Sequence, residues 1–304
     1  MHARLILLAT VLALVVAPLA LGVAGWMRAR RDAAVAPAPR GASGWDWRLS
    51  LASALACTLA FNLMFFLQEL FLVLPKAFVP GLHPTLFHNN HAWTGDDPRA
   101  ALFQGTGVVA TLLAGAACLL VARGCAACSP AMRLWLAWMA WCGCLMALPQ
   151  VVAGALLPGS DVGMAMGYLR LDPATKSVAA LVALAAIVAV ALALRRPLLE
   201  VAADAARIDG PAARTRFAFE VATLPALAAI ALVVPFRVPR DPVEVVVVPL
   251  VVMLAGIGWV QAGAWRVTDA KPAGKRIASI GRLAAAVVAL LLVFQLALRP
   301  GIAF

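Results

Sequence analysis

Long apolar runs separated by short polar stretches dominate this chain. Most of these runs are long enough to cross a hydrocarbon core of about 30 Å as a helix. We predict eight spans, of which the sixth and eighth are the shortest: Leu5–Trp26, Leu49–Leu74, Ala101–Ala122, Leu134–Leu157, Ser177–Leu194, Val221–Phe236, Val245–Trp265 and Leu283–Leu298. The pattern therefore predicts an all-α polytopic bundle of about eight transmembrane helices.

The composition agrees with a membrane protein. Hydrophobic residues make up 64% of the chain and charged residues 13%, and the mean hydropathy is +0.94. No connection between spans is long enough for an independent soluble domain, so we expect one integral membrane domain over residues 1–304. The first run exceeds the apolar core of about 7–15 residues in a cleaved signal peptide, and we expect it to be retained as a span.

Basic residues give the bundle a predicted orientation. Most of the 25 Lys and Arg residues fall in the odd-numbered connections, which the positive-inside rule places in the cytoplasm. Both termini and the loop after the second span are then outside. Abundant Arg and Ala indicate a GC-rich bacterium, hence a bacterial cytoplasmic (inner) membrane. The net charge of +11 fits contact with anionic lipid. We expect the lipid bilayer and a membrane-protein partner or substrate as partners, and no nucleic acid.

Polar residues gather in and after the second span. Glu69 is the only acidic residue inside the eight runs, and a carboxylate within a membrane costs several kcal/mol unless it is paired, protonated or bound to an ion. Three of the four histidines follow it closely, at His83, His88 and His91. The pattern predicts a functional site at the outer membrane face.

A further carboxylate, Asp161, follows the fourth span. The prolines and glycines of 157–163 end that helix and bring Asp161 to the same face as the histidines. Imidazole and carboxylate ligands suit zinc or another divalent cation, and an open position on that cation could activate water. We therefore predict that His83, His88, His91 and Asp161 are metal ligands, and that Glu69 is a ligand or a general base.

Two plainer interpretations of these residues stay open. The histidines of the loop could pair with Asp96, with Asp97 or with lipid phosphates instead of a metal. Asp161, which glycines flank, could simply cap the helix that follows, over Met164–Leu169. The pair Cys125 and Cys128 is either a redox pair or half of a zinc site.

Between Asn62 and Leu169 the chain resembles the site-2 protease family of intramembrane zinc metallopeptidases. The resemblance depends on the order of Glu69, the connection Asp97–Gly107, and the proline-rich span end with Asp161 and Gly163. It implies that Glu69 is the catalytic glutamate and Asp161 a zinc ligand. It also implies a metallopeptidase-like core at 47–170, with additional C-terminal helices at 171–304.

The chain departs from that family at several motif positions. The two motif histidines fall on Gln68 and Leu72, and the Gly-Pro pattern falls on Gly105-Thr106-Gly107. The loop histidines would have to supply the missing ligands, or the protein is an inactive relative. Bacterial members usually open their catalytic centre to the cytoplasm, whereas the charge pattern here predicts an outer site.

Two classes of function follow. The first is a metal-dependent membrane hydrolase of metallopeptidase type. The second is a non-enzymatic transporter or accessory subunit of a membrane complex, in which Glu69 lies on a polar path with four glutamines: Gln104, Gln150, Gln261 and Gln295. No histidine lies within a predicted span and no phosphate-binding Gly-rich loop is present, which argues against b-type haem and nucleotide hydrolysis.

Overall fold

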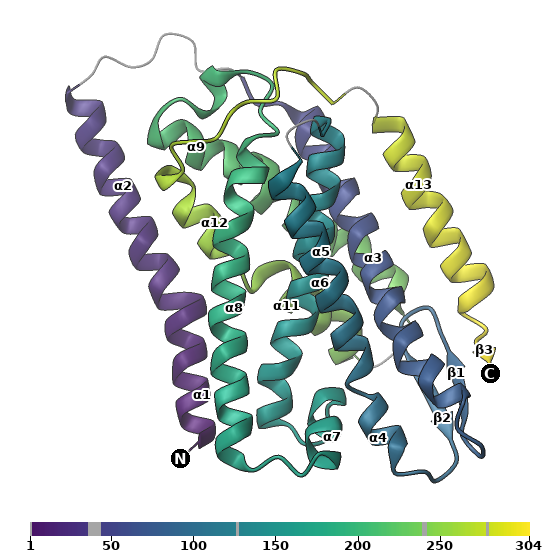
Figure 1. The fold of residues 1–304 in the computed structure, drawn as a ribbon. Coiled ribbons are helices and arrows are strands. Elements are labelled where there is room, and N and C mark those ends of the chain that lie inside the picture. The colour runs from purple at the N-terminus through teal and green to yellow at the C-terminus, as the bar shows by residue number, and fades with distance from the viewer. Residues whose placement is uncertain (1, 36–43, 126–127, 239–241, 278–279) are drawn as a thin grey trace.

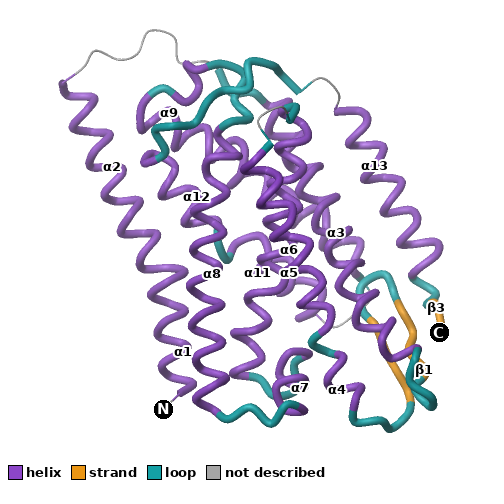
Figure 2. Tube along the Cα trace, in the orientation of Figure 1, coloured by secondary structure: helices purple, strands orange, loops and turns teal. Residues whose placement is uncertain are grey.

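The structure is a helical bundle with a small sheet at one end (Figures 1 and 2). The computed structural model describes residues 2–35, 44–125, 128–238, 242–277 and 280–304, with the backbone alone for 32–35. Within these residues, eight helical segments are long and apolar enough to cross a membrane: His2–Arg31, Trp47–Ala77, Arg99–Gly124, Pro130–Leu156, Pro173–Leu199, Gly210–Arg237, Val243–Arg266 and Ile280–Leu298. The predicted all-α bundle of eight spans is confirmed, and its apolar helices indicate a bilayer environment.

Several spans consist of more than one helical segment. The α-helices are α1 (His2–Val11), α2 (Ala17–Val35), α3 (Trp47–Ala77), α4 (Arg99–Phe103), α5 (Thr106–Gly124), α6 (Pro130–Leu156), α7 (Asp161–Tyr168), α8 (Pro173–Leu199), α9 (Gly210–Ala218), α10 (Leu224–Val233), α11 (Val248–Leu254), α12 (Ile257–Gly263) and α13 (Ile280–Val293). The π-turns are Leu12–Val16, Phe219–Thr223, Val243–Val247 and Phe294–Leu298; the 3₁₀ turns are Ala205–Ile208, Val234–Arg237 and Ala264–Arg266.

The two most buried spans, α3 and α6, form the centre of the bundle, and α6 packs against α3, α5 and α8. Small residues allow α5 and α6 to approach closely, since a Cβ added to Gly143 would lie 2.7 Å from the Cα of Gly115. The first span and α13 lie at opposite edges of the bundle (Figure 1). Most of their residues are left facing the surroundings.

Side chains and prolines set where the helices begin. Ser129 accepts a hydrogen bond from the Met132 N–H at the start of α6, and Asp172 does the same for Ala174 and Thr175 at the start of α8. At α7 the cap is Ser160, whose Oγ accepts from the Gly163 N–H at 3.2 Å. The capping role considered for Asp161 therefore belongs to its neighbour, and Asp161 lies in the first turn.

A buried ion-pair network fixes the end of the bundle away from the termini. The Arg207 Nη2 donates to Glu220 Oε1 at 2.5 Å, and its Nη1 donates to Asp46 Oδ2 at 3.3 Å. The side chain of Glu220 also accepts the Asp46 backbone N–H at 2.7 Å. These contacts join the start of α3 to the connection before α9, segments far apart in sequence.

The loop after the second span is a β-hairpin, which the sequence pattern did not predict. Strand β1 (His83–Leu86) pairs antiparallel with β2 (His91–Thr94), and β3 (Ile302–Ala303) pairs with the other edge of β1. The Phe304 N–H also donates to the Pro84 carbonyl at 3.0 Å. The hairpin, α4, α7 and both termini lie at the same end of the bundle (Figure 1).

Candidate functional site

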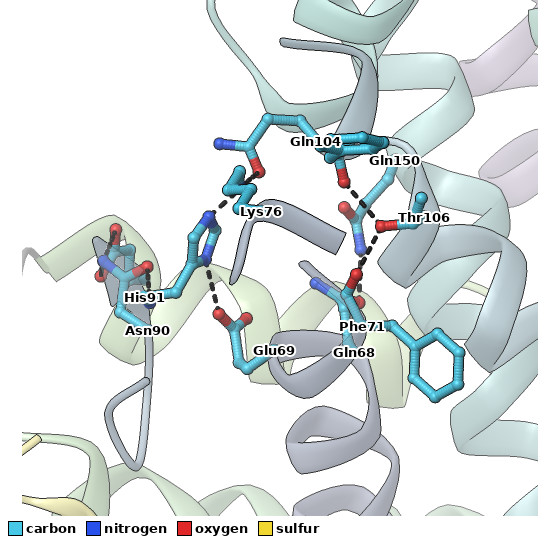
Figure 3. A network of polar contacts seen from close by, with 11 residues as sticks. Gln68, Glu69, Phe71, Lys76, Asn90, His91, Gln104, Thr106 and Gln150 are labelled. Carbon is cyan, nitrogen blue, oxygen red and sulfur yellow. Dashed lines mark hydrogen bonds and ion pairs between the residues drawn. The ribbon is translucent and has the colours of Figure 1, made fainter. Parts of the chain in front are cut away.

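Glu69 and His91 form a buried pair at the inner edge of the hairpin (Figure 3). Glu69 is in the last third of α3 and is 4% exposed, while His91 is the first residue of β2 and is 9% exposed. The His91 Nδ1 lies 2.8 Å from Glu69 Oε2. The prediction that the polar residues of the second span and of the following loop meet is confirmed for these two side chains.

Gln104, between α4 and α5, contacts the other side of the imidazole. Its Oε1 lies 3.0 Å from His91 Nε2 and accepts a hydrogen bond from Lys76 Nζ at 3.3 Å. Gln104 is 1% exposed and Lys76 is fully buried. The four side chains therefore form a continuous chain of polar contacts from Glu69 to Lys76, closed off from the surface.

These contacts give each ring nitrogen of His91 an oxygen partner. An ammonium group has donors only, so the atom of Gln104 that faces Lys76 is the carbonyl oxygen. The same oxygen faces His91 Nε2, and Glu69 Oε2 faces His91 Nδ1. A hydrogen on either ring nitrogen would therefore have an acceptor opposite it.

Lys76 completes the cluster, and sequence reasoning did not identify it as a site residue. It lies seven residues after Glu69, hence on nearly the same face of α3. Its Nζ lies 4.3 Å from the centroid of the Trp93 ring, which stacks on the His91 ring at 5.7 Å. The spacing of seven residues from Asn62 to Glu69 continues to Lys76, and that repeat was the available signal.

A cavity of about 530 Å³ opens beside Glu69, and we call it the Glu69 chamber. Its polar lining comes from α3, the hairpin turn, α6, the start of α7 and the segment 237–244; it consists of Gln68, Glu69, Asn89, Asn90, Gln150, Ser160, Asp161, Arg237 and Glu244. Its apolar wall includes Leu145, Met146, Val248, Val251 and Val252. The chamber is therefore acidic on one side and hydrocarbon-like on the other.

Asp161 lies on the chamber wall, outside the membrane-spanning segments. Burial is the largest cause that raises its pKa from 3.8 to about 6, and the negative charge of Glu69 raises it further. His91 and Lys76 act in the opposite direction, and Glu244 adds a smaller upward effect. The upward direction of the pKa shift therefore reflects burial first, with the neighbouring carboxylates adding to it.

Arg237 and Glu244 form the far side of the chamber. The Asn90 Nδ2 donates to both carboxylate oxygens of Glu244, at 2.9 and 3.0 Å, and the Arg237 Nε donates to the Glu244 carbonyl at 3.1 Å. The Arg237 guanidinium carbon lies 4.0 Å from the centroid of the Phe65 ring. The sequence pattern did not place Glu244 or Arg237 at the site.

The structure distributes the predicted metal ligands unevenly. Glu69 and Asp161 line the chamber, and His91 contacts Glu69. His88 is buried in the hairpin turn and His83 is exposed at the start of β1, and neither is part of the chamber lining. Across the described ranges, no group of three or more His, Cys, Asp or Glu side chains is arranged to hold a metal ion. The predicted zinc site therefore gains no support from the geometry.

The polar path considered for the four glutamines is also not continuous. Gln150 lines the chamber and donates to Gln68 at 2.8 Å, and Gln104 belongs to the His91 cluster. Gln261 instead donates to the Thr215 carbonyl, and Gln295 donates to the Phe236 carbonyl. Only two of the four glutamines lie beside Glu69.

The positions at which the site-2 protease family carries its motif histidines have other roles here. Gln68 is held by Gln150, and Leu72 is buried against α5. A Cβ added to Gly107 would lie 2.9 Å from carbons of both side chains, so this glycine allows α5 to approach α3. No family model, curated protein or solved structure matches this chain. The family resemblance remains a prediction.

Outside this site, Cys125 and Cys128 are joined by a disulfide between α5 and α6. The sequence left open whether this pair is a redox pair or half of a zinc site. The disulfide fits the first interpretation.

Proposed function

We propose that this multi-pass membrane protein is a transporter that exchanges protons for an amphiphilic cation at the Glu69 chamber. The observation that carries the proposal is the buried contact between Glu69 and His91, 2.8 Å apart beside a cavity of about 530 Å³. Ionisable residues buried within membrane bundles commonly mark substrate or proton pathways. In the proposed orientation, the chamber opens to the outer face of a bacterial cytoplasmic membrane.

The charge of the chamber supports a cationic substrate. Three carboxylates, of Glu69, Asp161 and Glu244, line the chamber with one guanidinium, of Arg237. Asn90 holds Glu244, whereas no hydrogen bond or ion pair within the described chain engages the carboxylate of Asp161. A positively charged group near Asp161 and Glu69 would replace the solvation that these carboxylates lose on burial.

The apolar wall supports an amphiphile over a small hydrated ion. Leu145, Met146 and Val252 face the same cavity as the carboxylates, and pockets of this size commonly bury most of a drug-sized ligand. A ligand with an apolar body and a cationic group would satisfy both sides at once.

Exchange follows from competition for the same negative charge. A cation bound beside Glu69 stabilises its ionised form, so the proton of the Glu69–His91 pair is released; protonation of the pair in turn weakens cation binding. One proton leaves for each cation that enters, so charge is conserved within the chamber. His91, held by Gln104, positions the proton that is exchanged.

The test is calorimetric titration of purified protein with tetraphenylphosphonium, a permanently charged amphiphile. Titrations in buffers of different ionisation enthalpy give the number of protons released. We expect about one proton per cation, since the proposal assigns one exchangeable proton to the Glu69–His91 pair. Glu69→Gln should abolish both binding and proton release, whereas Asp97→Asn, which neutralises a carboxylate paired with Arg99 at the surface, should change neither.

Transport itself is measured with ethidium uptake into proteoliposomes that have an acidic interior. Uptake that needs the pH gradient and is lost in Glu69→Gln supports exchange. Binding without uptake would assign the chain the role of an accessory subunit, and binding that persists unchanged in Glu69→Gln would overturn the proposal.

A divalent-metal membrane hydrolase is the second candidate, because Glu69 and Asp161 line one cavity and His91 contacts Glu69. Both ring nitrogens of His91 are occupied, by Glu69 and Gln104. Metal ligation would require one of them to move away. Elemental analysis of the purified protein decides: a stoichiometric metal that is lost in His91→Ala would replace the transport proposal.

A further inference from the structure

A second cavity lies at the opposite end of the bundle from the Glu69 chamber, between the first span and the segments α9 and α12. It has a volume of about 920 Å³, and we call it the Arg216 groove. Its walls include Leu19, Val23, Phe219 and Ala262, with Arg216 and Trp265 beside them. The groove is not part of the site described above.

The groove faces the surroundings of the bundle. The first span has few buried residues and packs on the bundle mainly through α8 and α12 (Figure 1). It contacts α12 through small residues, since a Cβ on Gly22 would lie 3.6 Å from the Ala262 Cβ and one on Gly258 would lie 3.2 Å from the Pro18 Cβ. A molecule in the groove therefore contacts the bilayer and the protein together.

Two polar side chains of the groove, Thr215 and Gln261, are already engaged. Gln261 donates to the Thr215 carbonyl at 3.0 Å and accepts from the Thr223 hydroxyl at 2.7 Å. Besides the exposed Trp26 indole, two donors are left in the described structure. The Trp265 indole N–H is buried without an acceptor, and the exposed Arg216 guanidinium has no hydrogen-bond or ion-pair partner.

The charge around the groove is positive. The Arg30 guanidinium carbon lies 3.9 Å from the centroid of the Trp26 ring, which lines the groove together with Arg216. None of the described residues that line the groove is acidic. Two unneutralised guanidinium groups beside a long apolar wall are complementary to an anionic, apolar partner.

We propose that the Arg216 groove binds an anionic phospholipid of the membrane. One acyl chain lies along Leu19, Val23 and Ala262, and the phosphate accepts hydrogen bonds from Arg216. Guanidinium groups bind phosphate in a bidentate manner, and tryptophan is enriched at the level of lipid headgroups. The inference depends on the bilayer environment and is independent of the transport proposed above.

Native mass spectrometry of the full chain tests this inference. The protein is titrated with phosphatidylglycerol or with phosphatidylcholine of the same acyl chains. We expect phosphatidylglycerol to bind more tightly, and Arg216→Gln to weaken it about fivefold, the usual effect of one basic residue near anionic lipid. Arg299→Gln, which removes an exposed charge beyond α13 at the other end of the bundle, is the matched control and should bind as the wild type does.

A second variant tests the shape of the groove. Gly22→Leu adds a side chain to the apolar wall and should reduce the binding of both lipids while leaving proton release with tetraphenylphosphonium unchanged. Equal affinity for the two lipids, or undiminished phosphatidylglycerol binding in Arg216→Gln, would overturn the proposal. So would a stable dimer with the groove closed to lipid, because a second copy of the chain would then be the occupant.

Discussion

Replacing Gln104 with leucine should be among the most destabilising single changes at the site. Leucine has a similar volume, so the change removes hydrogen bonding without opening a large cavity. The Gln104 oxygen accepts from two buried donors, Lys76 Nζ at 3.3 Å and His91 Nε2 at 3.0 Å. An unsatisfied buried donor costs about 1–3 kcal/mol, and more when it is charged.

The loss of both contacts should therefore lower the free energy of unfolding by about 3–6 kcal/mol. The assay is unfolding of the purified protein in mixed micelles of increasing SDS fraction, followed by tryptophan fluorescence. Gln104→Glu keeps an acceptor for both donors. Its free energy of unfolding should fall by less than half of the decrease expected for Gln104→Leu. Gln150→Leu is the matched amide control, since it removes hydrogen bonds to Gln68 and to the Met146 carbonyl, each at 2.8 Å and beside the chamber, where water can replace them.

The expected order of stability is thus wild type, Gln150→Leu and Gln104→Leu, from most to least stable. A Gln104→Leu protein within about 1 kcal/mol of wild type would contradict the assignment of two buried donors to one oxygen. An equal loss of stability in Gln104→Glu and Gln104→Leu would also contradict it. That outcome would mean that the oxygen of Gln104 is not the property that stabilises the protein.

Four further outcomes are expected. Asp161 has a folded-state pKa of about 6 against 3.8 for the free side chain, so its folded state holds the extra proton and its contribution to stability is lost as pH rises from about 4 through 6. The free energy of unfolding of Asp161→Asn should therefore exceed that of wild type at pH 7 by up to about 3 kcal/mol. At pH 4 the two values should be equal, and unfolding measured at both pH values checks this. Arg207→Met leaves Glu220 buried without its guanidinium and should cost about 3–5 kcal/mol in the same assay, and a cost near zero would contradict the network. Maleimide should label Cys125 and Cys128 only after reduction, as read by mass spectrometry. Alkaline phosphatase fused after β3 should be active and a green fluorescent protein dark if the termini are outside, and the reverse result would invert the predicted orientation.

The spans could be predicted from sequence because bilayer thickness dictates the length of an apolar run, whatever its neighbours are. Glu69 could be identified for a related reason: a carboxylate within such a run is costly and rarely without a role. The structure confirmed its meeting with His91, although the two are 22 positions apart.

The remaining partners depend on tertiary structure that no local pattern encodes. The strands of the hairpin are four residues long and contain Pro84, which is unfavourable for a central strand. Their pairing determines that His91 points inward while His83 is exposed. Arg237 follows the sixth span like any interfacial basic residue, and only its burial against Phe65 distinguishes it.

The short strand β3 has a consequence for how the protein is made. It pairs with β1 through Thr85 and Leu86, the residues beside the hairpin turn that leads to His91. Because β3 follows α13, the ribosome releases it only after the eighth span has been synthesised. The sheet beside Glu69 and His91 therefore cannot be completed by a chain that is still being inserted, and the hairpin gains its third strand last.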